Sequence, residues 1–265
     1  MSTVWRCFGP IGGALVALAV AGVARADPDP APAPAKPDDA PIRPPPFKEN
    51  IATPALEPTR HIEIGVHVLT ISRPAADTVE SGAPAGVVYS PTLGIEVGLR
   101  FPIFKYLQAG AFITGGRHHI DFSKGAMGVQ GAIDSDGLTT IWFGAKAFPT
   151  LPIGEYVRLF GVAGVAWGRF EFPQMTAHEP GRAPFTIKGR GNSFVTFPLG
   201  VGSSFEVIKH WLAVDLELDF SPMLHKDGTS FIDVQAIDNG KTRTVGPLPK
   251  VNVTFTQSVG LSLLL

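Results

Sequence analysis

The end of the chain alternates between apolar residues and small or polar ones. In residues 251–265, apolar side chains stand at every odd position except Gln257, and small or polar ones stand at the even positions up to Ser262. A period of two places successive side chains on opposite faces of a β-strand. This segment therefore predicts a strand with one apolar and one polar face, ending directly on apolar residues.

Seven segments further up the chain repeat the same alternation. The clearest is residues 92–101, where Leu, Ile, Val, Leu and Phe alternate with Gly, Glu, Gly and Arg. With the terminal segment, the pattern predicts eight strands, each close to the ~9–11 residues that a tilted membrane strand needs. The predicted strands are residues 61–70, 92–101, 106–116, 139–148, 155–172, 193–207, 211–220 and 251–265.

The connections between these segments alternate between long and short along the chain. The short ones are residues 102–105, 149–154 and 208–210, and the long ones are residues 73–91, 117–138, 173–192 and 221–250. Short turns at one end and long loops at the other are typical of outer-membrane barrels, whose short turns face the periplasm. An even number of strands places both ends of the chain on that side.

Alternation alone does not say which face of a barrel is outside. Soluble barrels such as lipocalins have apolar interiors and polar surfaces. Here the apolar stripe is almost free of charge, whereas the polar stripe combines charged residues with many glycines. Glycine leaves room for charged neighbours inside a narrow barrel. The pattern therefore favours an all-β fold, an eight-stranded antiparallel up-and-down transmembrane β-barrel with its apolar stripe facing lipid.

The charged residues of the polar stripe predict a cluster inside the barrel. Eight strands leave an interior that side chains fill, and an isolated charge there costs several kcal/mol. The hypothesis is a buried ion-pair cluster that plugs the lumen, and the alternative is that the same residues only stabilise the fold. The predicted members are Glu63, Glu96, Arg100, Lys146, Arg158, Glu206, Asp215 and Glu217, with Glu96 and Asp215 nearer the middle.

The start of the chain predicts export. Residues 1–26 combine Arg6, an apolar run and the small-x-small sequence Ala24-Arg25-Ala26, which together indicate a cleaved signal peptide, with an uncleaved anchor as the alternative. Residues 27–58 are rich in Pro and Ala and predict a disordered periplasmic linker or tether. The barrel domain then covers residues 59–265. Cys7 is the only cysteine, so the mature chain can form no disulfide.

Charge limits the classes of partner. The chain has 22 basic and 23 acidic residues, and removing Arg6 and Arg25 with the signal peptide leaves 20 against 23. This balance offers no electrostatic footprint for nucleic acid.

One stretch carries residue types that could support catalysis. Residues 117–123 read Arg-His-His-Ile-Asp-Phe-Ser, which loosely resembles the lipid A deacylase family, where His and Ser stand two residues apart on a strand. Ser123 is four residues from His119, so the spacing fails, and adjacent histidines on a strand point to opposite faces. We therefore expect a solvated loop here.

Two further loop motifs fail in the same way. Asp134-Ser135-Asp136-Gly137 has no glutamate at the twelfth position of a calcium loop, and the glycines at 125, 128 and 131 lack the Lys-Ser/Thr of a phosphate loop. We expect no catalytic, cofactor-binding or metal site, and the protein is not expected to be an enzyme.

Together, the terminal strand, the signal sequence and the rhythm of the connections resemble the small bacterial outer-membrane barrels of the OmpA/OmpX/OmpW kind. The resemblance implies a monomer in outer-membrane lipid and lipopolysaccharide, recognised by the barrel assembly machinery through its C-terminal strand. Leu265 departs from the Phe or Trp that usually ends this family. The implied function is structural or surface-interacting. The alternatives are a narrow channel or transporter for small molecules, a lipid-modifying membrane enzyme, and a secreted barrel that binds an apolar ligand.

Overall fold

The computed structural model describes residues 61–74, 86–226, 234–248 and 250–265, all within one compact unit, Ala52–Leu265. The predicted signal peptide and Pro-rich linker lie outside the described residues. Among the described residues, no helix is long and apolar enough to cross a membrane.

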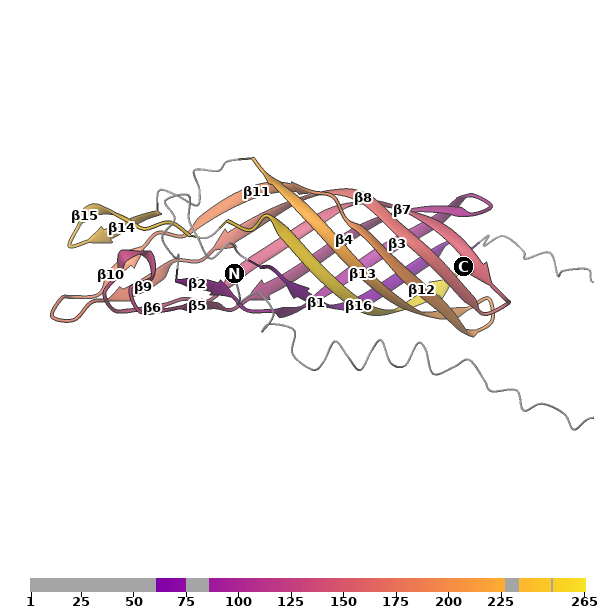
Figure 1. The fold of residues 1–265 in the computed structure, drawn as a ribbon, viewed down its shortest axis with the longest axis horizontal. Helices are drawn as coiled ribbons and strands as arrows, with labels where there is room; N and C mark the ends of the chain where they lie inside the picture. Colours follow the sequence, from indigo (N-terminus) through magenta and orange to yellow (C-terminus); the bar gives the residue numbers. More distant parts are fainter. Residues whose placement is uncertain (1–60, 75–85, 227–233, 249) are drawn as a thin grey trace, which may run out of the picture. The chain divides into compact units, whose positions relative to one another are not determined.

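Strands arranged as a closed ring form the main body of this unit (Figure 1). Each neighbouring pair is antiparallel, and the first and last strands also pair with each other, from Glu63 with Leu264 to Ser72 with Phe255. In sequence order, the ring consists of β1 (Glu63–Ser72), β3 (Thr92–Phe104), β4 (Leu107–His118), β7 (Leu138–Ile153), β8 (Val157–Phe172), β11 (Arg190–Thr196), β12 (Leu199–Ile208), β13 (Leu212–His225) and β16 (Val253–Leu264).

The ring has eight positions because β11 and β12 share one of them. Both strands pair with β8 and with β13 in one continuous register, and they are separated only by Phe197 and Pro198. Proline has no N–H to donate to the ladder, which explains the break. The predicted eight-stranded antiparallel barrel is confirmed.

The strands are longer at the short-turn end than the sequence pattern predicts. The sequence pattern predicts short turns near residues 102–105 and 149–154, but residues 102–104 extend β3 and residues 149–153 extend β7. Near a hairpin end the sheet tolerates a residue that lacks a donor, and Pro102 lies beside a register shift in the β3–β4 pair. The connection between β7 and β8 reduces to three residues that contain Gly154 at φ 73°.

The apolar stripe points away from the barrel axis on every wall strand. Ile95 is 60% exposed and Val201 is 62% exposed, whereas Glu96 beside Ile95 is buried. On the terminal strand Phe255, Val259, Leu261 and Leu263 are exposed in the same way, and the alternate residues face inward. The predicted orientation of the two faces is therefore confirmed.

The long connections form a second folded layer at the end of the barrel away from the C-terminus, which we call the cap (Figure 1). Its core includes Val129, Met175, Ile187 and Val234, all buried. The elements of the cap are the pair β2 (Val87–Tyr89) and β5 (Ile120–Phe122), the short 3-10 helix η1 (Ala126–Gly128), and a five-stranded sheet of β15 (Lys241–Val245), β14 (Val234–Asp238), β10 (Phe185–Ile187), β9 (Met175–His178) and β6 (Ala132–Asp134).

The sequence predicts long loops for these segments and a solvated loop for residues 117–123, but the structure has short paired strands here. Strands of three to five residues are too short to show a clear period of two, and their pairing joins connections that are distant in sequence, such as residues 132–134 with 176–178.

Candidate functional site

The inward faces of the wall strands gather a set of charged residues inside the barrel, which we call the lumen network. They come from β1, β3, β7, β8 and β13, and each is at most 7% exposed. Period two places the residues of one strand on one face, and the closed ring turns all of these faces toward each other. The lumen network comprises Glu63, His67, Glu96, Arg100, Lys146, Arg158, Asp215, Glu217 and Asp219.

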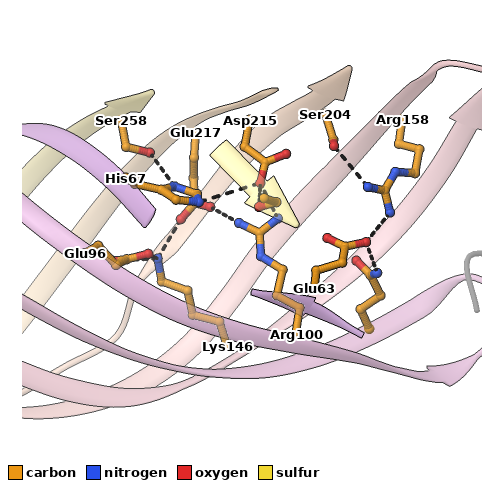
Figure 2. Close-up of polar contacts among 12 residues, drawn as sticks. Glu63, His67, Glu96, Arg100, Lys146, Arg158, Ser204, Asp215, Glu217 and Ser258 are labelled. Carbon is orange, nitrogen blue, oxygen red and sulfur yellow. Dashed lines mark hydrogen bonds and ion pairs between the residues drawn. The ribbon is translucent and has the colours of Figure 1, made fainter. Parts of the chain in front are cut away.

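Lys146 lies at the centre of the network and binds three carboxylates, those of Glu217, Asp219 and Glu96. Figure 2 shows Lys146 with Glu96 and Glu217. Its Nζ atom is 2.6 Å from Oε1 of Glu217, 3.2 Å from Oδ2 of Asp219 and 3.3 Å from Oε1 of Glu96. An ammonium group has three donors, so these contacts use its full capacity. The remaining Glu96 oxygen accepts a hydrogen bond from the Thr114 hydroxyl at 2.8 Å.

Arg100 shares Glu217 with Lys146 and binds Asp215 as a second carboxylate. Its Nη2 is 3.1 Å from Oε2 of Glu217, and its Nη1 is 3.4 Å from Oδ2 of Asp215. The guanidinium carbon also lies 4.3 Å from the ring centre of Phe148 and 4.9 Å from that of Phe160. Aromatic faces favour a nearby cation when water is excluded. The positive charge of Arg100 is therefore compensated by two carboxylates and by two aromatic rings.

Asp215 joins His67 and the terminal strand to the network. The Ser262 hydroxyl donates to Oδ2 of Asp215 at 2.6 Å, and Nε2 of His67 lies 3.6 Å from the same oxygen. The imidazole packs against Gly260, where an added Cβ would lie 2.3 Å from Cδ2 of His67. Glycine at 260 is thus a condition for this side chain to fit.

Glu63 and Arg158 form a second, separate group within the lumen (Figure 2). Nη1 of Arg158 contacts Oε1 of Glu63, and Nη2 donates to the Ser204 hydroxyl at 3.0 Å. Nε2 of Gln108 donates to the same Glu63 oxygen at 2.7 Å. This group has one carboxylate, one guanidinium and two neutral polar partners.

The structure places seven of the eight residues named from the sequence in these two groups. Glu206 is not among them: it is partly exposed near the end of β12, and its Oε2 accepts a hydrogen bond from the His210 backbone N–H at 3.1 Å. Glu206 still pairs with Ala213, but a register shift follows it in the β12–β13 pair, so it lies at the irregular end of the strand. His67 and Asp219 were not in the predicted cluster, although each lies on the polar stripe of its strand, the signal that could have identified them.

Side chains fill the interior around the network. Two cavities there enclose about 10 Å³ each, close to the lower limit for one water molecule. The first is lined by Arg73, Glu96, Trp142, Lys146, Asp219 and Thr256, among others.

His118 differs from the solvated residue that the sequence predicted. It is fully buried at the end of β4, with Nδ1 3.0 Å from the Ser90 carbonyl oxygen, which requires this nitrogen to be the donor. Burial and the positive charge of Arg73 lower the pKa of His118 to about 4, against the hydrogen bond to Ser90, which raises it. The prediction was wrong because the cap strands cover this position.

The other members of the same stretch do not assemble with His118. His119 is exposed and lies 3.3 Å from Asp121, and the Ser123 hydroxyl donates to the Gly86 carbonyl at 3.1 Å. In the part of the chain that the structure describes, no group of three or more His, Cys, Asp or Glu residues is arranged to hold a metal ion.

No family model and no curated protein matches the sequence. The structure is similar to that of Ail, the attachment invasion locus protein of Yersinia pestis, at 14% identity and a TM-score of 0.40, covering 77% of this chain and 97% of that one. Neisserial surface protein A matches at 10% identity and a TM-score of 0.40, covering 76% and 96%. A major outer membrane protein of Thermus thermophilus matches at 11% identity and a TM-score of 0.46, covering 77% and 99%. These similarities concern the fold alone, an eight-stranded barrel like that of small outer-membrane proteins.

Proposed function

We propose that the protein is an outer-membrane β-barrel with a structural or surface-interaction role, whose lumen is plugged by the lumen network. The observation that carries the proposal is the belt of exposed aliphatic and aromatic side chains around a closed ring of strands. Soluble monomers rarely expose apolar patches larger than a few hundred Å². A closed barrel also pairs all of its backbone groups, as a membrane-spanning sheet must.

The buried ion pairs favour a closed lumen rather than a narrow channel. Lys146 and Arg100 are surrounded by four carboxylates, and the cavities beside them enclose only about 10 Å³ each. An ion crossing this interior would have to break several low-dielectric contacts, each of which costs several kcal/mol to leave unpaired. We therefore propose that the barrel does not conduct ions at neutral pH.

The cap supports a surface role. Its sheet is built on a buried apolar core, so it presents a defined surface at the long-loop end, which faces outward in such barrels. We propose lipid and lipopolysaccharide of the outer membrane as the surroundings of the belt, and the barrel assembly machinery as the partner of β16. We also propose that the protein is a monomer and that it is not an enzyme.

Fractionation of the full chain, expressed in a Gram-negative host, tests the membrane assignment. We expect the protein in the outer-membrane fraction, extracted only by detergent, with a folded band on gels that shifts on heating. Recovery as a monomer in plain buffer would reject the proposal. Planar-bilayer recordings at pH 7 test the closed lumen, and regular current steps would show a channel instead.

A further inference from the structure

Arg73 is a buried cation outside the lumen network. It follows β1, is 2% exposed and forms no ion pair with a carboxylate among the described residues. Its Nη1 contacts the Thr140 hydroxyl and its Nε donates to the Thr254 hydroxyl at 3.3 Å. The guanidinium carbon lies 5.3 Å from the ring centre of Trp142 and 5.0 Å from that of Phe170. Its Nη2 is buried without an acceptor in the described region.

Asp219 is the carboxylate with the least compensation in the network around Lys146. Its Oδ2 shares the Lys146 ammonium with Glu217 and Glu96, and its Oδ1 is buried without a donor in the described region. A buried polar atom without a partner costs about 1–3 kcal/mol, and more if the group is charged. Nη2 of Arg73 therefore lacks an acceptor, and Oδ1 of Asp219 lacks a donor, so each could supply what the other needs.

Both residues line the same cavity of about 10 Å³. We propose that Arg73 and Asp219 form an ion pair through one water molecule in this cavity, and that this pair seals the lumen at its cap end. The water accepts a hydrogen bond from Nη2 of Arg73 and donates one to Oδ1 of Asp219. Such bridging waters typically make two to four hydrogen bonds, and Thr254 and Thr256 supply further hydroxyls in the lining.

The charges inside the barrel favour this ion pair rather than an anion bound beside Arg73. Glu63, Glu96, Asp215, Glu217 and Asp219 face the interior together with Arg100, Lys146 and Arg158, so the lumen network has two more carboxylates than permanent cations. Arg73 supplies a further positive charge next to this acidic excess. An anion beside Arg73 would be repelled by Glu96 and Asp219, which line the same cavity.

A double-mutant cycle tests the pair in the full barrel refolded in detergent micelles. The variants are Arg73→Met, Asp219→Asn and the double variant, and the measurement is the unfolding equilibrium in urea. We expect each single variant to be destabilised and the double variant to be destabilised at least about fivefold less, in equilibrium constant, than the product of the two single effects. The matched control cycle uses Arg73→Met with Glu206→Gln, which should be additive. Additivity in both cycles would overturn the pair.

Iodide quenching of Trp142 fluorescence tests the occupant of the cavity. With Trp167→Phe and Trp211→Phe, and the signal peptide with Trp5 absent, Trp142 is the only tryptophan. We expect little quenching in this background and stronger quenching when Arg73→Met removes the seal. Strong, saturable quenching with Arg73 present would show that an anion occupies the site and would overturn the water bridge.

The ion pair between Arg73 and Asp219 rests on the proposed closed lumen, and separate experiments can reject each of them. Current steps from the unsubstituted protein at pH 7 would reject the closed lumen whatever the result of the cycle. A silent barrel with additive Arg73 and Asp219 substitutions would reject only the seal.

Discussion

The carboxylate of Glu217 binds Lys146 at 2.6 Å and, through its other oxygen, Arg100 at 3.1 Å. A single side chain of β13 thus links cations that come from β7 and β3. All three side chains are buried, so these ion pairs are shielded from bulk solvent.

Glu217→Gln should destabilise the barrel strongly. The substitution keeps the size of the side chain but leaves two buried cations undercompensated, and breaking a buried pair in this way costs about 3–5 kcal/mol. Urea unfolding in micelles measures the effect. Glu206→Gln, at a partly exposed position near the end of β12, should stay within about 0.5 kcal/mol. Equal stability of the two variants would contradict the central role of Glu217.

Gly260→Ala should destabilise the barrel because the new Cβ would lie 2.3 Å from the His67 ring. Overpacking of this kind costs about 1–3 kcal/mol. The matched control is Gly115→Ala, where the new Cβ would meet only the Thr140 carbonyl oxygen, at 3.9 Å. Thermal unfolding of both variants, alone and with His67→Ala, provides the measurement. If His67→Ala does not relieve the defect at 260, the steric explanation is wrong.

Acidification should weaken the junction between barrel and cap through His118. This residue lies outside the apolar belt, since its neighbours Arg117 and His119 are exposed and charged or polar. Its folded pKa is lowered to about 4, while the unfolded value is near 6.5. Below pH 6.5 the unfolded state therefore binds a proton that the folded state does not, so stability is complete above pH 6.5 and falls towards pH 4.

The loss should approach roughly 3 kcal/mol at pH 4, from about 1.4 kcal/mol for each unit of pKa difference. Unfolding measured from pH 4 to pH 8 provides the comparison between the natural chain and His118→Gln. The variant should have a flatter profile between pH 4 and 6.5. Identical slopes would mean that His118 is not buried in its neutral form.

Val259→Arg should destabilise the barrel in lipid vesicles, because the side chain points outward from the middle of β16. Arginine at the bilayer midplane costs about 2–4 kcal/mol, falling to about 0–1 kcal/mol near the interface. Leu265→Arg, at the end of the chain, is the matched control. If both substitutions cost the same, the apolar belt does not lie in hydrocarbon.

The period-two pattern determined most of the barrel from the sequence. Alternation is a local property, so strand existence, the inward face and the opposite exposure of neighbours such as Ile95 and Glu96 could all be predicted from nearby residues. It also determined which residues could enter the lumen, and seven of the eight named from it are there.

Only the tertiary structure decided which of those inward residues meet. Parity placed Glu206, Asp219 and His67 equally on inward stripes, but their depth along the barrel depends on how the strands are staggered around the ring, which no single segment encodes. The same holds for the cap and for the burial of His118. Short strands from four connections that are distant in sequence must pair before the cap exists and covers this residue. Local alternation sets the face of a side chain, whereas its partners depend on the register of strands far apart in sequence.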